Sequence, residues 1–165
     1  LYDALKMGIQ PDGLFLIEDL GFRSGPLMSL DAYTRALFPA HQRLGKFLDE
    51  LGISYFVHSD GDVRSFIPSF IKAGVKVLQP LEARAGLDVG KLKAEYGRDL
   101  AFMGNINVDE LSKTQEDIEK EVRDKVLIAK KDGGYIYHSD HSIPPQVSLS
   151  NYRLLMKYLH NYGRY

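Results

Sequence analysis

Short apolar runs alternate with longer amphipathic stretches along the chain. Each run is followed by a polar turn and then by apolar residues at helical spacing. Near-continuous apolar runs are typical of parallel strands that are covered on both faces. We therefore predict an α/β fold of about five βα units, with strands over residues 13–18, 53–58, 75–80, 100–105 and 134–138.

The helices between these strands have their own start and stop signals. Ser29 is a predicted N-cap of a helical segment that breaks near Pro39 and ends at Gly52. Further helices are predicted to end at Gly74 and at Gly133. Their apolar stripes are Val63, Phe66, Ile67, Phe70 and Ile71, then Ile118, Val122, Val126 and Ala129, and last Tyr152, Leu155 and Leu159.

Composition narrows the class of protein. With 165 residues, 44% of them hydrophobic, residues 1–165 are expected to form one globular domain. A net charge of −1 favours neither nucleic acid nor an anionic membrane as partner, and no apolar segment approaches the roughly 20 residues of a membrane span. The absence of cysteine suits a reducing compartment, so we expect a cytoplasmic protein. Because the chain starts at Leu1, in what looks like the end of a helix, we expect a piece of a longer protein.

Polar side chains follow every predicted strand. In a parallel βα array such residues lie at the carboxyl ends of the strands, and in a barrel they meet at one rim. They are Glu18 and Asp19, then His58, Asp60 and Asp62, then Glu82 and Arg84, then Asn105 and Asn107, and last His138, Asp140 and His141.

Each of these groups has a functional and a structural interpretation. His58 and Asp60 are two residues apart, so both point to the same side and could bind a divalent metal. Alternatively, His58 bonds a carbonyl while Asp60 and Asp62 start the next helix. Glu82 could serve the site or pair with Arg84.

The tripeptide His-Ser-Asp occurs at residues 58–60 and again in the last loop, at residues 138–140, where it is followed by His141. Pro144 and Pro145 hold a rigid, extended loop there. His141 could thus act as a ligand or an acid/base group, or could bond a backbone carbonyl, and His138 and Asp140 have the same alternatives. Neither a phosphate-binding glycine loop nor a Gly-x-Ser-x-Gly elbow is present.

Four segments together resemble the uroporphyrinogen decarboxylase superfamily, which includes cobalamin-linked methyltransferases. They are IEDLGFRSGPLMSLDAYTRALFPAHQRL, YFVHSDGDV with FIKAGVKVLQPLE, LAFMGNINVDEL, and GGYIYHSDHSIPPQVSLSNYRLLMKYLHNYG. The resemblance implies a TIM (β/α)₈ barrel with its site at the carboxyl ends of the strands. This chain would be the C-terminal part of that barrel, without the first three or so strands.

The methyltransferase branch binds zinc through His-x-Cys, in some members a Glu, and a Cys in the final loop. By the resemblance these ligands correspond to His58, Asp60, Glu82 and His141, with aspartate and histidine in place of both cysteines. Such a set implies a divalent metal, zinc foremost, that activates a small substrate for methyl transfer to a thiol or from a corrinoid carried by a partner protein. His141 would be the catalytic residue, and the substrate-binding residues would be Glu18, Asp19 and Asn105.

Two other functions remain open from the sequence. In a tetrapyrrole decarboxylase, His141 would contact the substrate and no metal would be needed, although the acidic rim suits a polycarboxylate poorly. Alternatively, the chain is a degenerate, non-catalytic barrel. An isolated half-barrel leaves a sheet edge uncovered, so we expect residues 1–165 alone to associate with a second copy.

Overall fold

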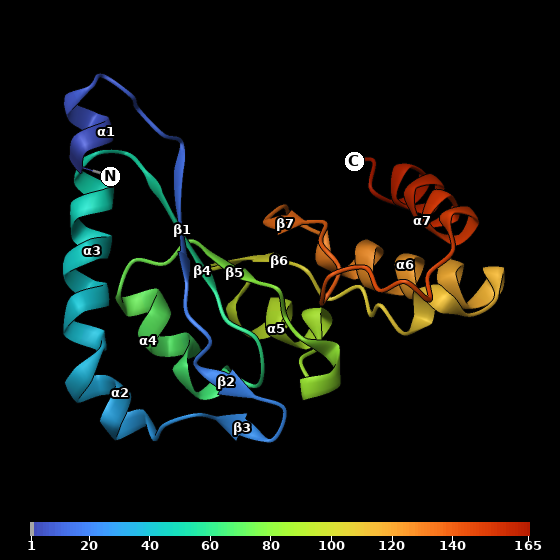
Figure 1. The fold of residues 1–165 in the computed structure, drawn as a ribbon, viewed down its shortest axis with the longest axis horizontal. Coiled ribbons are helices and arrows are strands. Elements are labelled where there is room, and N and C mark those ends of the chain that lie inside the picture. Colours follow the sequence, from blue (N-terminus) through green and yellow to red (C-terminus); the bar gives the residue numbers. More distant parts are fainter. Residues whose placement is uncertain (1) are drawn as a thin grey trace.

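The computed structural model describes residues 2–165 and contains a parallel sheet with helices packed along it (Figure 1). The sheet has five strands in the order β1-β4-β5-β6-β7, and all neighbours are parallel. Their bounds are β1 Gly13–Ile17, β4 Ser54–His58, β5 Val77–Gln79, β6 Ala101–Met103 and β7 Tyr135–Ile136. All five predicted strands are therefore confirmed, each somewhat shorter than its apolar run.

The helices follow the predicted alternation with the strands. They are α1 Tyr2–Lys6, α2 Leu30–Ala36, α3 Phe38–Glu50, α4 Ile67–Lys72, α5 Val89–Tyr96, α6 Gln115–Ala129 and α7 Leu149–Tyr162. Short 3-10 turns lie at Arg64–Phe66, Ala83–Ala85 and Glu110–Ser112. Ser29 caps α2 through a 3.1 Å bond from the Ala32 N–H, and the expected break falls at Leu37, with Pro39 in the first turn of α3.

One face of the sheet carries most of the core. Tyr55, Val57, Leu78 and Phe102 are buried in the cluster that contains residues of α4 and α5. A second cluster joins α6 to α7, which lie together at the far end of the molecule in Figure 1.

The outer strand β1 is covered on one face only. Leu14 and Leu16 pack against the core, whereas Phe15 and Ile17 are 43% and 72% exposed on the other face. Strand alternation places the two exposed residues on the side that faces the inside of a barrel. This apolar face is the surface on which the predicted self-association of residues 1–165 would occur.

A small hairpin, β2 (Gly21–Phe22) and β3 (Gly25–Pro26), packs on the loop after β4. The contact requires glycine, because a Cβ on Gly61 would meet the Phe22 nitrogen at 2.3 Å, and Gly61 has φ +78°. The Asp62 N–H also donates to the Phe22 carbonyl at 3.0 Å. The loop after β1 and the loop after β4 are thereby held against each other.

No helix within residues 2–165 is both long enough and apolar enough to cross a membrane.

Candidate metal centre at the strand ends

Asp19, His58 and Asp60 lie together where β1 and β4 end. The ladder between the strands continues past β1, because the Glu18 N–H donates to the His58 carbonyl at 2.9 Å. Asp19 follows beside His58, with its Oδ1 3.3 Å from Nε2 of His58, and Oδ1 of Asp60 lies 3.9 Å from the same nitrogen. The three ligand atoms are all within 4.8 Å of one another.

Glu82 approaches this cluster from the loop after β5. Its Oε2 accepts the Gly61 N–H at 2.9 Å, and it lines a cavity of about 630 Å³ together with Asp19 and Asp60. The alternative pairing of Glu82 with Arg84 is not what the structure contains, because Arg84 makes its ion pair with Asp109. Glu82 thus lines the same cavity as the two aspartates of the cluster, and its carboxylate accepts a hydrogen bond from the backbone.

Asp62 takes the structural role that the sequence left open. Its carboxylate bonds Nε and Nη2 of Arg64 at 2.8 and 2.6 Å and also accepts the Arg64 N–H. These contacts lower the pKa of Asp62. The Asp60 side chain, in contrast, is 37% exposed and lines the cavity. Within this loop, therefore, Asp62 stabilises the turn and Asp60 faces the cavity.

The final loop brings His141 to the other side of Asp60. His141 lines a smaller cavity of about 240 Å³ with His58, Asp60 and His138. Its Nδ1 accepts the Ser142 N–H at 2.9 Å, so the ring is oriented by the loop backbone. The structure therefore brings His141 into the same neighbourhood as His58 and Asp60, but outside the three-residue cluster.

Gln79, at the end of β5, is a site residue that the sequence analysis missed. It pairs in register with His58, and its Oε1 lies 2.5 Å from Nδ1 of His58. Its Nε2 lies 3.3 and 3.5 Å from the two ring nitrogens of His138. The available signal was a polar residue ending the apolar run VKVLQ, at the same place in its strand as His58 in YFVH.

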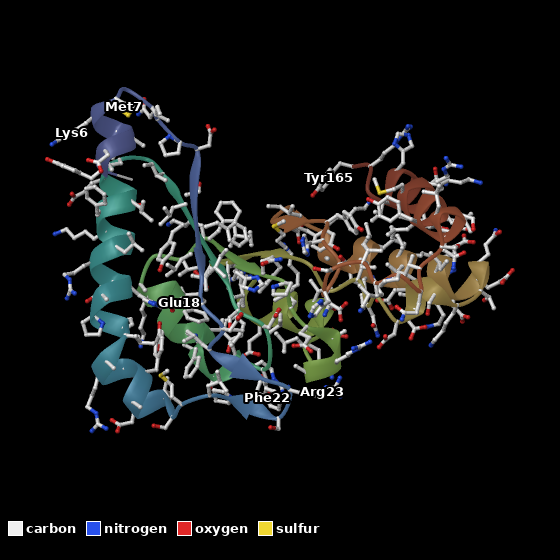
Figure 2. The ribbon with its side chains drawn as sticks, viewed as in Figure 1. Lys6, Met7, Glu18, Phe22, Arg23 and Tyr165 are labelled. Atoms are coloured by element: carbon white, nitrogen blue, oxygen red, sulfur yellow. The ribbon has the colours of Figure 1, made fainter. Side chains whose placement is uncertain are left out.

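The hairpin contributes a cavity wall that no sequence pattern indicated. Phe22, Arg23 and Leu27 line the larger cavity together with the carboxylates, and Figure 2 shows Phe22 and Arg23 at the hairpin. Phe22 and Leu27 are exposed, so the wall offers apolar contact area to a ligand. Strands of two residues have no periodicity that a sequence could reveal.

Two predicted substrate-binding residues lie elsewhere. Asn105 is fully buried: its Oδ1 accepts the Val89 N–H, and its Nδ2 donates to the carbonyls of Leu81 and Leu87 at 2.7 and 2.9 Å. Both the oxygen and the nitrogen of its side-chain amide are thus used in hydrogen bonds that join loops beneath the rim. A direct substrate contact by Asn105, as predicted, does not fit this placement.

Glu18 points to the helix side of β1 and not into the cavity. Its Oε2 lies 2.9 Å from Nε2 of the buried His41, whose Nδ1 is 2.9 Å from the Tyr33 hydroxyl. Burial, together with the nearby Glu18 charge, raises the pKa of Tyr33 and Tyr55. Figure 2 shows Glu18 between β1 and the helices. Successive residues of a strand face opposite sides, so Glu18 faces the helices and Asp19 faces the rim.

Asp140, the aspartate of the second His-Ser-Asp stretch, is 1% exposed and holds loops together. Its Oδ1 accepts the Val108 N–H at 2.9 Å and its Oδ2 accepts the Ala83 N–H at 3.1 Å. Burial raises its pKa, although the two backbone donors oppose the shift.

With this geometry in place, comparison with known proteins identifies the family. The sequence profile described as Uroporphyrinogen decarboxylase (URO-D) matches residues 12–162. The chain belongs to the uroporphyrinogen decarboxylase family. The resemblance drawn from the four sequence segments is therefore confirmed.

A curated relative agrees with the URO-D assignment, and a solved structure has a similar fold. A uroporphyrinogen decarboxylase of Vesicomyosocius okutanii subsp. Calyptogena okutanii (strain HA) is 31% identical over 78 residues, 47% of this chain and 23% of that protein. A methyltransferase from Methanosarcina mazei superposes with a TM-score of 0.70 at 19% identity, over 99% of this chain and 46% of that one. The chain thus spans less than half of the methyltransferase, and its fold is that of a partial barrel.

Proposed function

We propose that the full-length protein is a methyltransferase-like enzyme of the URO-D superfamily that activates a small substrate at a divalent metal. The observation that carries this proposal is the convergence of Asp19, His58 and Asp60, which come from two strand ends and offer three ligand atoms within 4.8 Å. Metal–ligand distances of about 2.0–2.2 Å require ligand atoms somewhat closer than this, a change that side-chain rotation can supply.

The donor set suits a borderline metal with an open position. One imidazole and two carboxylates favour zinc, iron, manganese or cobalt, and the two carboxylates balance a 2+ charge. Asp19 was predicted to contact the substrate and is here proposed as a ligand beside His58 and Asp60. Glu82 and His141, in the adjoining cavities, are the remaining candidates for a fourth position.

The metal would supply Lewis acidity, which lowers the pKa of a bound water or thiol. The residues of the chain would perform the other tasks. Phe22 and Leu27 would contact the apolar part of the substrate, and Arg23 at the cavity wall would meet an anionic group. If Glu82 takes the fourth ligand position, His141, exposed in the final loop beside His58, would exchange the proton of the bound substrate. The methyl group would pass to a thiol or come from a corrinoid on a partner protein.

The curated relative favours a second candidate, tetrapyrrole decarboxylation, because it is itself a uroporphyrinogen decarboxylase. In that case His141 would contact the substrate without a metal. The larger cavity, however, is lined by three carboxylates, from Asp19, Asp60 and Glu82, and by the guanidinium of Arg23. Because negative charge predominates there, this surface repels a substrate that has many carboxylates.

Metal content distinguishes the two functions. We expect full-length protein purified without chelator to contain about one equivalent of a divalent metal by elemental analysis. His58→Ala and Asp60→Ala should each weaken binding by at least about 100-fold, beyond the roughly 10- to 100-fold typical of changes behind a ligand.

The matched control is His160→Ala, which removes an exposed histidine of α7 and should keep the wild-type metal content. Wild-type protein without stoichiometric metal would contradict the proposal and favour the decarboxylase. If such protein also lacked decarboxylase activity, a non-catalytic role would be favoured.

A further inference from the structure

A further cavity, separate from the candidate metal centre, lies between α3 and the turn that joins α4 to β5. Its volume is about 490 Å³, within the roughly 300–1,000 Å³ of small-ligand sites. Figure 1 shows α3 beside α4, and the cavity lies where α4 ends and β5 begins. Asp19, His58 and Asp60 lie at the opposite ends of the strands, so a ligand in this cavity would not be the substrate of the metal centre.

Small residues form the bottom of this cavity. Gly45 of α3 approaches the turn so closely that a Cβ on it would lie 1.7 Å from the Ala73 carbonyl oxygen. Both Gly45 and Ala73 are buried, and Gly74 follows them in the lining. Because these residues have at most a methyl group as side chain, the hollow stays open and its walls are made by longer side chains.

Four cations line the walls of the cavity. Arg43 and Lys46 come from α3, whereas Lys72 ends α4 and Lys76 precedes β5. The one acidic residue in the lining is Asp49, so the lining has a net charge of +3, while the whole chain has a net charge of −1. Positive charge is therefore concentrated at this place.

Within residues 2–165, none of these four cations has a carboxylate partner. Other cations of the chain do have one: the arginines that form ion pairs are Arg35, Arg64, Arg84 and Arg123. Like charges that share a cavity repel one another, and a bound anion removes this repulsion. The fold thus maintains a positive cavity that an anion from solution would stabilise.

A smaller basic cavity, between α5 and α6, lacks this property. Its volume is about 330 Å³, and its charged lining residues are Lys93, Arg98, Lys131 and Asp132. Lys93 donates a hydrogen bond to the Gly133 carbonyl, so one of the three cations is already bonded within the chain. The cavity beside α3 has more positive charge and no such internal acceptor.

We propose that the cavity between α3 and the α4–β5 turn binds a small ligand with at least two phosphate groups, such as a diphosphate ester. One phosphate group has about −1.5 to −2 charges at pH 7, so two of them match the net charge of the lining. Arg43 can bind phosphate oxygens in a bidentate manner, and the three lysines neutralise charge. A flat acidic protein surface would contact the exposed ends of the cations but would leave the hollow above Gly45 unfilled.

Calorimetric titration of inorganic pyrophosphate into the full-length protein tests this site. At physiological ionic strength we expect one equivalent to bind with a Kd below about 1 mM. Inorganic phosphate, with about half the charge, should bind more weakly. The double variant Lys46→Ala, Lys72→Ala removes one exposed cation from each wall and should weaken pyrophosphate binding by about 10-fold. Lys46→Arg, Lys72→Arg keeps both charges and should bind like wild type.

Two control variants locate the anion. Arg98→Ala, Lys131→Ala removes the same number of exposed cations from the cavity between α5 and α6, so it should retain wild-type affinity for pyrophosphate. His58→Ala removes a proposed metal ligand and should also retain pyrophosphate binding.

Four results would overturn the proposal. Wild type without saturable pyrophosphate binding would exclude the site, and equal losses in the two double-alanine variants would show a general effect of charge. A loss in His58→Ala would place the anion at the metal centre. Tighter binding of oligoglutamate than of pyrophosphate would assign the surface to an acidic protein instead. Failure of the proposed metal function would leave all of these expectations unchanged.

Discussion

The two His-Ser-Asp stretches place the same three residue types at two strand ends, but the burial and the contacts of these residues differ. After β4, Asp60 is at the edge of two cavities, while after β7, Asp140 is buried and accepts two backbone N–H groups. The histidines differ too, since His58 faces carboxylates and His138 faces a carbonyl. Identical tripeptides therefore do not imply identical roles.

The residues that follow each tripeptide explain the difference. Gly61, with φ +78°, turns the first loop sharply against the hairpin, so Asp60 stays near the surface. In the second stretch the ladder continues instead: the Asp140 N–H donates to the Ile106 carbonyl at 2.8 Å, and the carboxylate is drawn between the loops that contain Ala83 and Val108.

The largest expected difference is in stability. Asp140→Ala should lower the free energy of unfolding by about 2–4 kcal/mol, because the Val108 and Ala83 N–H groups lose their acceptors in a buried place. Asp60→Ala should change it by less than about 1 kcal/mol, since that side chain is partly exposed. Urea unfolding of the full-length variants measures both. Equal losses would mean that the two aspartates are structurally equivalent after all.

The sequence predicted the βα order, the Ser29 cap and the rim because these depend on local patterns. It could not assign Asp60 and Asp140 to different roles, because burial is decided by loops distant in the chain. Glu18 and Asp19 show a related limit: at a strand end, adjacent residues face opposite sides, and the apolar run does not reveal which side is the barrel interior. Gln79 was missed because its partners come from other strands.

A smaller contrast is expected in the pH dependence of stability. Burial raises the pKa of Asp140, so the native protein keeps this proton to higher pH than the unfolded chain. Its contribution is thus fully present below the ordinary aspartate pKa and is lost as pH rises through the raised native value. The stability of wild type relative to Asp140→Asn should therefore decrease as pH rises across this window.

Asp62, next to the first stretch, provides the opposite case. Arg64 lowers the pKa of Asp62, so its contribution is present above the ordinary aspartate pKa and is lost as pH falls through the lowered value. Unfolding curves at several acidic pH values should show that the free energy of unfolding of wild type, relative to that of Asp62→Asn, increases as pH rises. Slopes of the same sign for Asp140→Asn and Asp62→Asn would refute the assignment of one carboxylate to burial and the other to an ion pair.

The smallest expected effects concern the middle residues, Ser59 and Ser139. The Ser59 hydroxyl accepts the buried Leu20 N–H at 2.9 Å, a bond that links the loop after β1 to the loop after β4. The Ser139 hydroxyl donates to the carbonyl of exposed His141, which water can satisfy instead. Ser59→Ala should therefore lower the free energy of unfolding by about 1 kcal/mol and Ser139→Ala by about 0.5 kcal/mol or less.

The same two variants should differ in metal binding. Since Asp19 is attached to the segment that Ser59 holds, Ser59→Ala should weaken metal binding modestly, while Ser139→Ala should leave it unchanged. The reverse order in either measurement would show that the second loop, and not the first, determines the geometry of the site.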